Sequence, residues 1–229
     1  MQGQTDRNSM KQSCIYDREM YELSYSRKSW NSSRKLLARC IRKGKPGPIL
    51  DIGCGLGLFV ECCYKFGIPC IGLEGSEYAV QAAKKREPNL DIRHHYLEDP
   101  LPFEDETFSM VMCNQVIEHL TKETARNNLR ESYRVLSERG TIIVYSPSTY
   151  NLKQSMDPTH INLHSPKALK KELEEAGFKK VKSFNKSLKF ELGLLNPLNK
   201  LIRALFTLFP FPFLSATANC MATKIKEER

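Results

Sequence analysis

A glycine-rich loop preceded by an acidic residue is the segment whose residue types most directly indicate chemistry. It reads Asp-Ile-Gly-Cys-Gly-Leu-Gly over residues 51–57. Glycines in such a loop let the backbone turn tightly and bring a ligand against main-chain N–H groups. Glu74 ends the next apolar run, where a carboxylate can accept hydrogen bonds from both ribose hydroxyls of a nucleoside. Together, the loop and this acid predict a cofactor that contains a nucleoside.

The spacing of the glycines separates two classes of cofactor. A dinucleotide fingerprint, G-x-G-x-x-G, would need glycine at position 58, where the sequence has Leu58. Asp51, two residues before the first glycine, would repel a pyrophosphate but attract the cationic amino group of a methionine moiety. The loop therefore favours S-adenosylmethionine over a dinucleotide, and a dehydrogenase is the disfavoured alternative.

Three of the five histidines lie where a proton acceptor would be useful. Methyl transfer to a hydroxyl requires removal of a proton, and histidine has a pKa suited to that role. We expect the catalytic group among His119, which follows the fourth expected strand, and His160 and His164, which follow the fifth. A packing role remains open for each of them. A zinc site at His160 and His164 would need further ligands, with Asp157 as one candidate, and we expect no metal.

Alternating strand and helix patterns position these residues in an α/β fold. Strands are expected at 49–52, 69–73, 91–96, 109–113, 141–145, 178–184 and 218–224. Helices are expected largely over 15–43, from the glycine-rich loop to about 66, from 76 toward 88, over 121–140 and over 166–176. Five strand–helix units and a terminal strand pair predict a seven-stranded, mostly parallel sheet with helices on both faces and the last strand antiparallel. We expect a helical cap over 1–48 and one domain over 49–229, with a hydrophobic insertion at about 188–216.

Several motifs in order resemble those of class I S-adenosylmethionine-dependent methyltransferases. ILDIGCGLG is similar to their motif I, IGLEGSEYAV to the second strand with its ribose-binding acid, YLEDPLPFEDETFSMVMCNQVIEHL to the run through strand four, and RVLSERGTIIVYSP to the step into strand five. The overlap covers roughly residues 49–180 and is most similar to the small-molecule subgroup with type 11 or type 23 domains. The resemblance implies a Rossmann-like fold, S-adenosylmethionine as methyl donor and S-adenosylhomocysteine as product.

The resemblance also implies cofactor contacts for individual residues. These are Asp51, Gly53, Cys54, Gly55 and Gly57 at the methionine end, Glu74 and Gly75 at the ribose and adenosine, Tyr96, Leu97 and Glu98 at the adenine, and Asn114 and Gln115 under the sulfonium. Tyr96 stands where the family often has aspartate, so adenine recognition is expected from Glu98 or from the backbone. Phe108-Ser109 likewise replaces a frequent Phe-Asp pair. The Asn/Asp-Pro-Pro-aromatic signature of amide and adenine-nitrogen methylation is absent, which favours an oxygen acceptor.

Composition and charge narrow the compartment and the partners. The chain has 229 residues, 41% of them hydrophobic, without a run long enough to span a membrane, and its first residues are polar, so we expect a cytoplasmic protein. Its eight cysteines contain no CxxC pair and are expected to be reduced. The net charge of +9 is concentrated in residues 1–48 and 153–203, but no RNA- or DNA-binding motif accompanies it. We therefore expect a small or lipid-linked acceptor rather than nucleic acid.

The apolar segment 204–214 leaves three interpretations open. It could be a lid over the active site, ordinary core together with a homodimer surface, or a patch that contacts a membrane from one side. The neighbouring Lys200 and Arg203 would suit an anionic lipid or a phosphate-bearing acceptor. Two alternative functions also stay open, namely methylation of RNA or protein and a non-catalytic subunit that binds S-adenosylmethionine.

Overall fold

The computed structural model describes residues 30–43, 47–184 and 217–225. The segments expected as an N-terminal cap before residue 30 and as a hydrophobic insertion over 188–216, including 204–214, lie outside these residues. The described helices are α2 (Trp30–Lys43), α3 (Leu58–Lys65), α4 (Glu77–Arg86), η2 (Ile117–His119), α5 (Lys122–Val135), α6 (Leu152–Ser155) and α7 (Pro166–Glu175). The strands are β1 (Ile49–Ile52), β2 (Cys70–Glu74), β3 (Ile92–His94), β4 (Phe108–Asn114), β5 (Leu136–Tyr145), β6 (Lys179–Ser183) and β7 (Cys220–Thr223).

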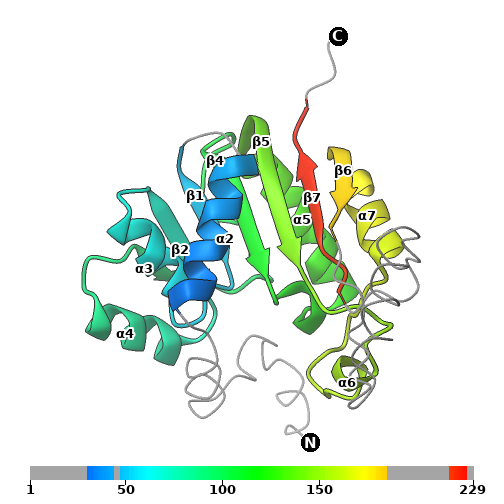
Figure 1. Ribbon diagram of the computed structural model, residues 1–229, viewed down its shortest axis with the longest axis horizontal. Helices are drawn as coiled ribbons and strands as arrows, with labels where there is room; N and C mark the ends of the chain where they lie inside the picture. Colours follow the sequence, from blue (N-terminus) through cyan, green and yellow to red (C-terminus); the bar gives the residue numbers. More distant parts are fainter. Residues whose placement is uncertain (1–29, 44–46, 185–216, 226–229) are drawn as a thin grey trace, which may run out of the picture.

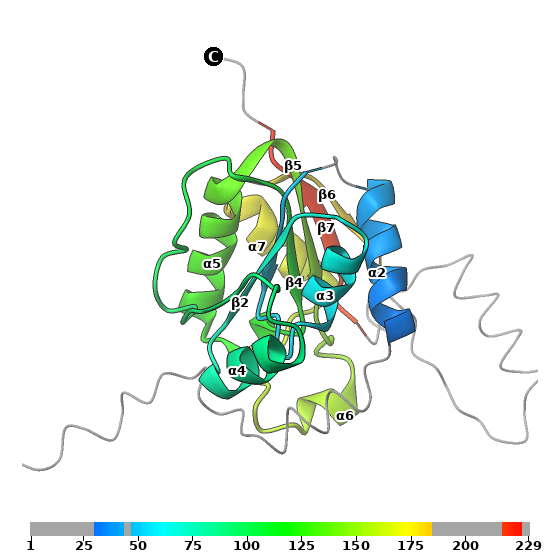
Figure 2. The same cartoon turned by 90° about the vertical axis from the view of Figure 1, so that its left-hand side faces the viewer.

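One seven-stranded sheet organises the molecule (Figure 1), in the order β3-β2-β1-β4-β5-β7-β6. The first five strands pair in parallel, and β7 pairs antiparallel with both β5 and β6. Helices α2 and α3 cover one face, and α5 and α7 cover the other (Figure 2). The expected fold is therefore confirmed. Strand order reverses between β1 and β4, the place where open α/β sheets bind ligands.

The central strands bury both of their faces, as their apolar sequences require. Along β4, Met110 and Met112 pack with residues of α2 and α3. The alternate residues Val111 and Cys113 pack with residues of α5 and α7. By contrast, the edge strand β6 carries exposed lysines, which discourage pairing with another sheet. The sheet is thus a rigid platform whose carboxyl edge presents the loops.

The boundary between α5 and β5 differs from the expected one. The predicted helix over 121–140 begins as expected, with Thr121 Oγ1 accepting a hydrogen bond from Thr124 N at 3.1 Å, but it ends at Val135. Gly140 is no helix cap, because its carbonyl accepts a hydrogen bond from Lys224 N at 2.9 Å within β5. The Lys224 ammonium donates to the carbonyl of Leu136 at 2.7 Å. Pairing with a distant segment therefore overrides the local helical pattern.

The chain after β4 also differs from its expected path. His119, which was expected to follow the fourth strand, ends the short helix η2, and α5 begins three residues later at Lys122. The brief helix α6 was not expected. In the part of the chain that the structure covers, no helix has the length and apolar character needed to cross a membrane.

Candidate active site

The glycine-rich loop makes a tight turn between β1 and α3. The N–H of Gly57 donates to the carbonyl of Cys54 at 3.0 Å, and the N–H of Cys54 donates to Leu73 of β2 at 3.0 Å. Gly53 and Gly57 have φ values of 66° and 70°, in the left-handed region that favours glycine. A Cβ at Gly57 would collide with Ile92 of β3. Packing against the end of the Ile92 side chain, as well as backbone conformation, therefore favours glycine at position 57.

Glu74 joins the loop to the end of β2. Its buried carboxylate accepts hydrogen bonds from Gly55 N at 2.8 Å through Oε2 and from Ser76 N at 2.9 Å through Oε1. A carboxylate oxygen has two lone pairs and can accept more than one hydrogen bond. Two backbone donors thus fix the orientation of a group that could bind ribose hydroxyls.

A cavity of about 460 Å³ lies between α2, the glycine loop and the ends of β4 and β5. Four predicted cofactor residues line it, namely Asp51, Gly53, Cys54 and Asn114, together with Ser32, Ser33, Lys35, Leu36, Arg39, Leu58, Phe59 and Tyr145. The sequence reasoning missed Arg39 and Tyr145, whose Nη1 and hydroxyl lie 3.1 Å apart in a hydrogen bond. No motif marks Arg39, because only tertiary packing brings α2 to this cavity.

The residues predicted at the adenine follow β3 and do not line the cavity. The carbonyl of Leu97 accepts a hydrogen bond from Asn128 Nδ2 at 2.6 Å, which fixes the backbone there. The Tyr96 ring packs edge-on against His94, whose Nε2 donates to the carbonyl of Gly75 at 2.9 Å. Glu98 is exposed. The structure therefore links Gly75 and Tyr96 through one histidine.

Gln115 adopts a left-handed conformation with φ of 60° directly after β4. Its N–H donates to the carbonyl of Tyr145 at 2.8 Å, and its side chain is exposed. Unlike its neighbour Asn114, it is not part of the cavity lining. The role of Gln115 under a sulfonium stays a prediction.

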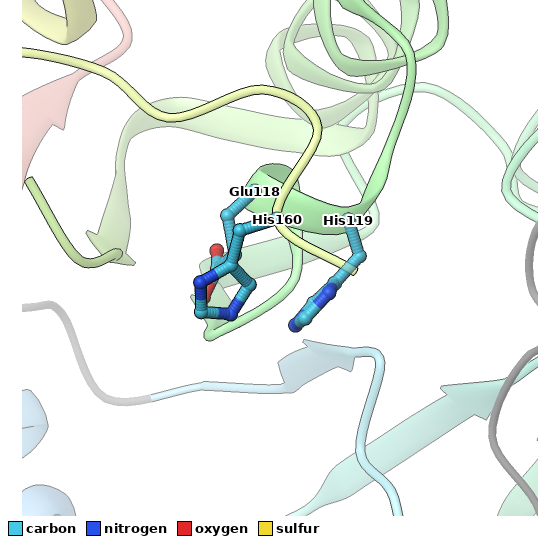
Figure 3. Close-up of side chains that lie close together, drawn as sticks. All are labelled: Glu118, His119 and His160. Carbon is cyan, nitrogen blue, oxygen red and sulfur yellow. The ribbon is translucent and has the colours of Figure 1, made fainter. Parts of the chain in front are cut away.

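Two of the three predicted catalytic histidines lie together with a buried carboxylate (Figure 3). The rings of His119 and His160 have centroids 4.7 Å apart. Glu118, which the sequence reasoning missed, is 0% exposed, and one ligand atom from each of the three residues lies within 4.8 Å of the others. Sequence spacing alone could not select Glu118, because adjacent residues usually point in different directions.

Backbone carbonyls fix both rings of this cluster. His119 Nδ1 lies 3.1 Å from the carbonyl of Thr159, and His160 Nδ1 lies 2.8 Å from that of Gln154. Because a carbonyl oxygen only accepts, each Nδ1 must be the donor. Burial lowers the pKa of His119 to about 4, against the opposing effect of the Thr159 carbonyl, so its Nε2 carries a lone pair at neutral pH.

His164 lies apart from this cluster. Its buried Nε2 is 3.0 Å from Oε2 of Glu172 on α7, and Arg126 of α5 approaches the other oxygen of Glu172 at 3.4 Å. This network joins the loop after β5 to two helices.

The seven cysteines among the described residues form no disulfide bonds. Burial raises the pKa of Cys40 to about 12 and that of Cys62 to about 11. Such thiols stay protonated and pack as small apolar groups.

Comparison with known proteins places this geometry in a family. Residues 50–144 match the model described as a methyltransferase domain. A probable S-adenosylmethionine-dependent methyltransferase of Mycolicibacterium smegmatis is 31% identical over 149 residues, which cover 63% of this chain and 55% of that protein. A crystal structure of an S-adenosylmethionine-dependent methyltransferase from Archaeoglobus fulgidus superposes with a TM-score of 0.71 at 25% identity, covering 91% of this chain and all of that one.

Shorter matches differ in the acceptor atom that their names give. Norajmaline N-methyltransferase of Rauvolfia serpentina is 30% identical over 49% of this chain and 40% of that enzyme. The mitochondrial ubiquinone biosynthesis O-methyltransferase of Bos taurus is 33% identical over 38% of this chain and 27% of that enzyme. The chain thus spans less than two thirds of the length of these relatives. On its domain match and its fold, the chain belongs to the class I S-adenosylmethionine-dependent methyltransferases.

Proposed function

We propose that the protein transfers the methyl group of S-adenosylmethionine to an oxygen atom of a small or lipid-linked acceptor. The observation that carries the proposal is the pair of buried carboxylates at the glycine loop, with Asp51 on the cavity wall and Glu74 bonded to Gly55. Asp51 would offer negative charge to the methionine end of the cofactor, and Glu74 would offer oxygens that bind the ribose hydroxyls.

These residues fit the cofactor of the family. Asp51 would hold the methionine ammonium through opposite charge, and Glu74 would accept hydrogen bonds from the ribose hydroxyls. Bound S-adenosylmethionine supplies a methyl carbon activated by a positive sulfur. The chain's own part is then to align the acceptor with that carbon and to exclude water.

An oxygen acceptor is supported by the histidine pair. In the neutral tautomer whose Nδ1 donates to a carbonyl, Nε2 of His119 and of His160 is an acceptor. A hydroxyl group is a donor that such atoms can orient. Lys35 and Arg39 add positive charge to the cavity wall, which supports an acceptor that carries a phosphate or carboxylate.

A transfer assay with methyl-labelled S-adenosylmethionine tests the proposal. Purified protein would be offered matched pairs of acceptors that differ only in a hydroxyl or an amino group, with and without a phosphate. We expect label in the hydroxyl members, and more of it where a phosphate is present. Labelling of the amino members alone would overturn the oxygen assignment but leave the methyl donor in place.

A further inference from the structure

We propose that Glu118, His119 and His160 bind a divalent transition-metal ion, with zinc as the preferred ion. The three side chains come from two segments, η2 and the loop after β5, and point toward one another (Figure 3). Their potential ligand atoms all lie within 4.8 Å of one another. Metal–nitrogen and metal–oxygen bonds of about 2.0 to 2.2 Å span such a group after small side-chain rotations.

The hydrogen bonds of the two rings match those of metal-binding histidines. Such histidines bind the metal through one nitrogen and donate the other N–H to a carbonyl or carboxylate, which fixes the ring. His119 and His160 both donate from Nδ1 to backbone carbonyls, at 3.1 and 2.8 Å. In the neutral tautomer with the proton on Nδ1, Nε2 is the nitrogen through which each ring would bind the ion.

The two segments that carry the ligands are locked together before any ion binds. Asn162 N donates to the carbonyl of Glu118 at 3.0 Å, and Asn162 Nδ2 donates to that of Ile117 at 3.2 Å. These bonds hold the loop that carries His160 against η2. The geometry of the cluster is therefore set by the backbone, as a precise site requires.

The buried carboxylate supplies the charge that the ion would complement. Glu118 is 0% exposed, so its carboxylate is shielded from water, which strengthens its attraction to a cation. Two histidines with one carboxylate favour zinc or another first-row transition ion over magnesium or calcium, which prefer oxygen ligands. Asp157, whose Oδ2 lies 3.9 Å from His160 Nε2, stands at the edge of the site as a further oxygen ligand.

The site deepens the proposed function, on which its catalytic role rests. Three protein ligands leave a coordination position open on zinc. An acceptor hydroxyl bound there, in place of a direct hydrogen bond to the two Nε2 atoms, would be polarised by the ion and would release its proton to solvent water. Its oxygen would then bond to the methyl carbon as the carbon–sulfur bond breaks, which leaves S-adenosylhomocysteine. Methyl transfer to that oxygen would then proceed at the end of β4, which η2 directly follows.

Titration of metal-free protein with Co²⁺ tests the site by absorption, without any methyl acceptor. We expect one ion per chain, visible bands typical of nitrogen and oxygen ligands, no thiolate-to-cobalt band, and displacement by Zn²⁺. His119→Ala, His160→Ala and Glu118→Gln should each weaken binding by more than the roughly 100-fold that loss of an outer-sphere partner costs. His164→Gln, which removes a histidine from the neighbouring network instead, should leave the affinity unchanged.

Binding of S-adenosylhomocysteine is measured on each variant as a check of the fold. No Co²⁺ binding by the parent protein, a thiolate band, or unchanged affinity in all three variants would overturn the proposal. If the histidine variants do not fold, the Co²⁺ spectrum of the parent protein and the Co²⁺ affinity of Glu118→Gln test the metal site. Metal binding without binding of S-adenosylhomocysteine would contradict the proposed function alone, whereas the reverse result would contradict the metal site alone.

Discussion

The Glu74 carboxylate accepts a hydrogen bond from the backbone N–H of Gly55 at 2.8 Å, which ties the end of β2 to the loop after β1. The same carboxylate accepts from Ser76 N at 2.9 Å, at the start of α4. One side chain therefore orders three segments around the expected ribose position. The carboxylate thus fixes the loop, and we expect the same group to bind the ribose of the cofactor.

Replacing Glu74 with glutamine should weaken binding of S-adenosylhomocysteine. Glutamine offers one acceptor oxygen in place of two charged ones, and hydrogen bonds to charged groups contribute about 1.5 to 3 kcal/mol. We expect a loss of roughly 10- to 100-fold in affinity by calorimetry, while Glu104→Gln, at an exposed position, should bind as the parent does. Equal affinities of the two variants would show that Glu74 does not contact the cofactor.

Gly57 and Gly67 form a matched pair for testing the glycine loop. Both have positive φ, at 70° and 67°, but a Cβ at Gly57 would meet Ile92, whereas one at Gly67 would meet nothing within 4 Å. Alanine at either position should lose about 1 to 2 kcal/mol of unfolding free energy from backbone strain. Gly57→Ala should lose about 1 to 3 kcal/mol more from overpacking. Urea denaturation compares them, and equal losses would exclude the packing role.

The network around Glu172 should make stability depend on pH in the acid range. Burial alone would raise the pKa of Glu172, but the hydrogen bond with His164 and the charges of His164, Arg126 and Lys122 bring it below its ordinary value. Because the folded-state pKa is depressed, the carboxylate stabilises the fold above the ordinary carboxyl pKa of about 4.3. That contribution is lost as pH falls through the lower folded-state pKa.

Glu172→Gln provides the test of that pH dependence. We expect the variant to be less stable at neutral pH by about 1 to 3 kcal/mol and to lose less stability than the parent between pH 5 and the acid limit, about pH 2. Urea denaturation at a series of pH values measures both. Parallel pH profiles of the two proteins would contradict the assigned role.

The order of strands and helices and the cofactor loop were predictable from local patterns. The short, mostly apolar run at 49–52 predicted the buried strand β1. The glycine spacing after it predicted the cofactor loop without any knowledge of tertiary contacts. The helix expected from residue 76 is present as α4, and Ser76 caps it by accepting a hydrogen bond from Ala79 N at 3.3 Å. Structural features that depend on residues close together in the sequence could thus be predicted from the sequence.

Features that depend on distant segments were not predictable. The start of β5 at Leu136 depends on Lys224, 88 residues later in the chain. The contact of Arg39 with Tyr145 joins residues 106 positions apart. No sequence motif marked Glu118 as a site residue. It joins His119 and His160 only because the short helix η2 packs against the loop that carries His160.

Calorimetric titration with S-adenosylhomocysteine, with NAD as the control, tests the central claim most directly. The acidic pair Asp51 and Glu74 around a G-x-G-x-G loop predicts micromolar binding of S-adenosylhomocysteine and no binding of NAD. Binding of NAD in preference, or no binding of S-adenosylhomocysteine by folded protein, would contradict the assignment of this loop and of the cofactor residues that depend on it.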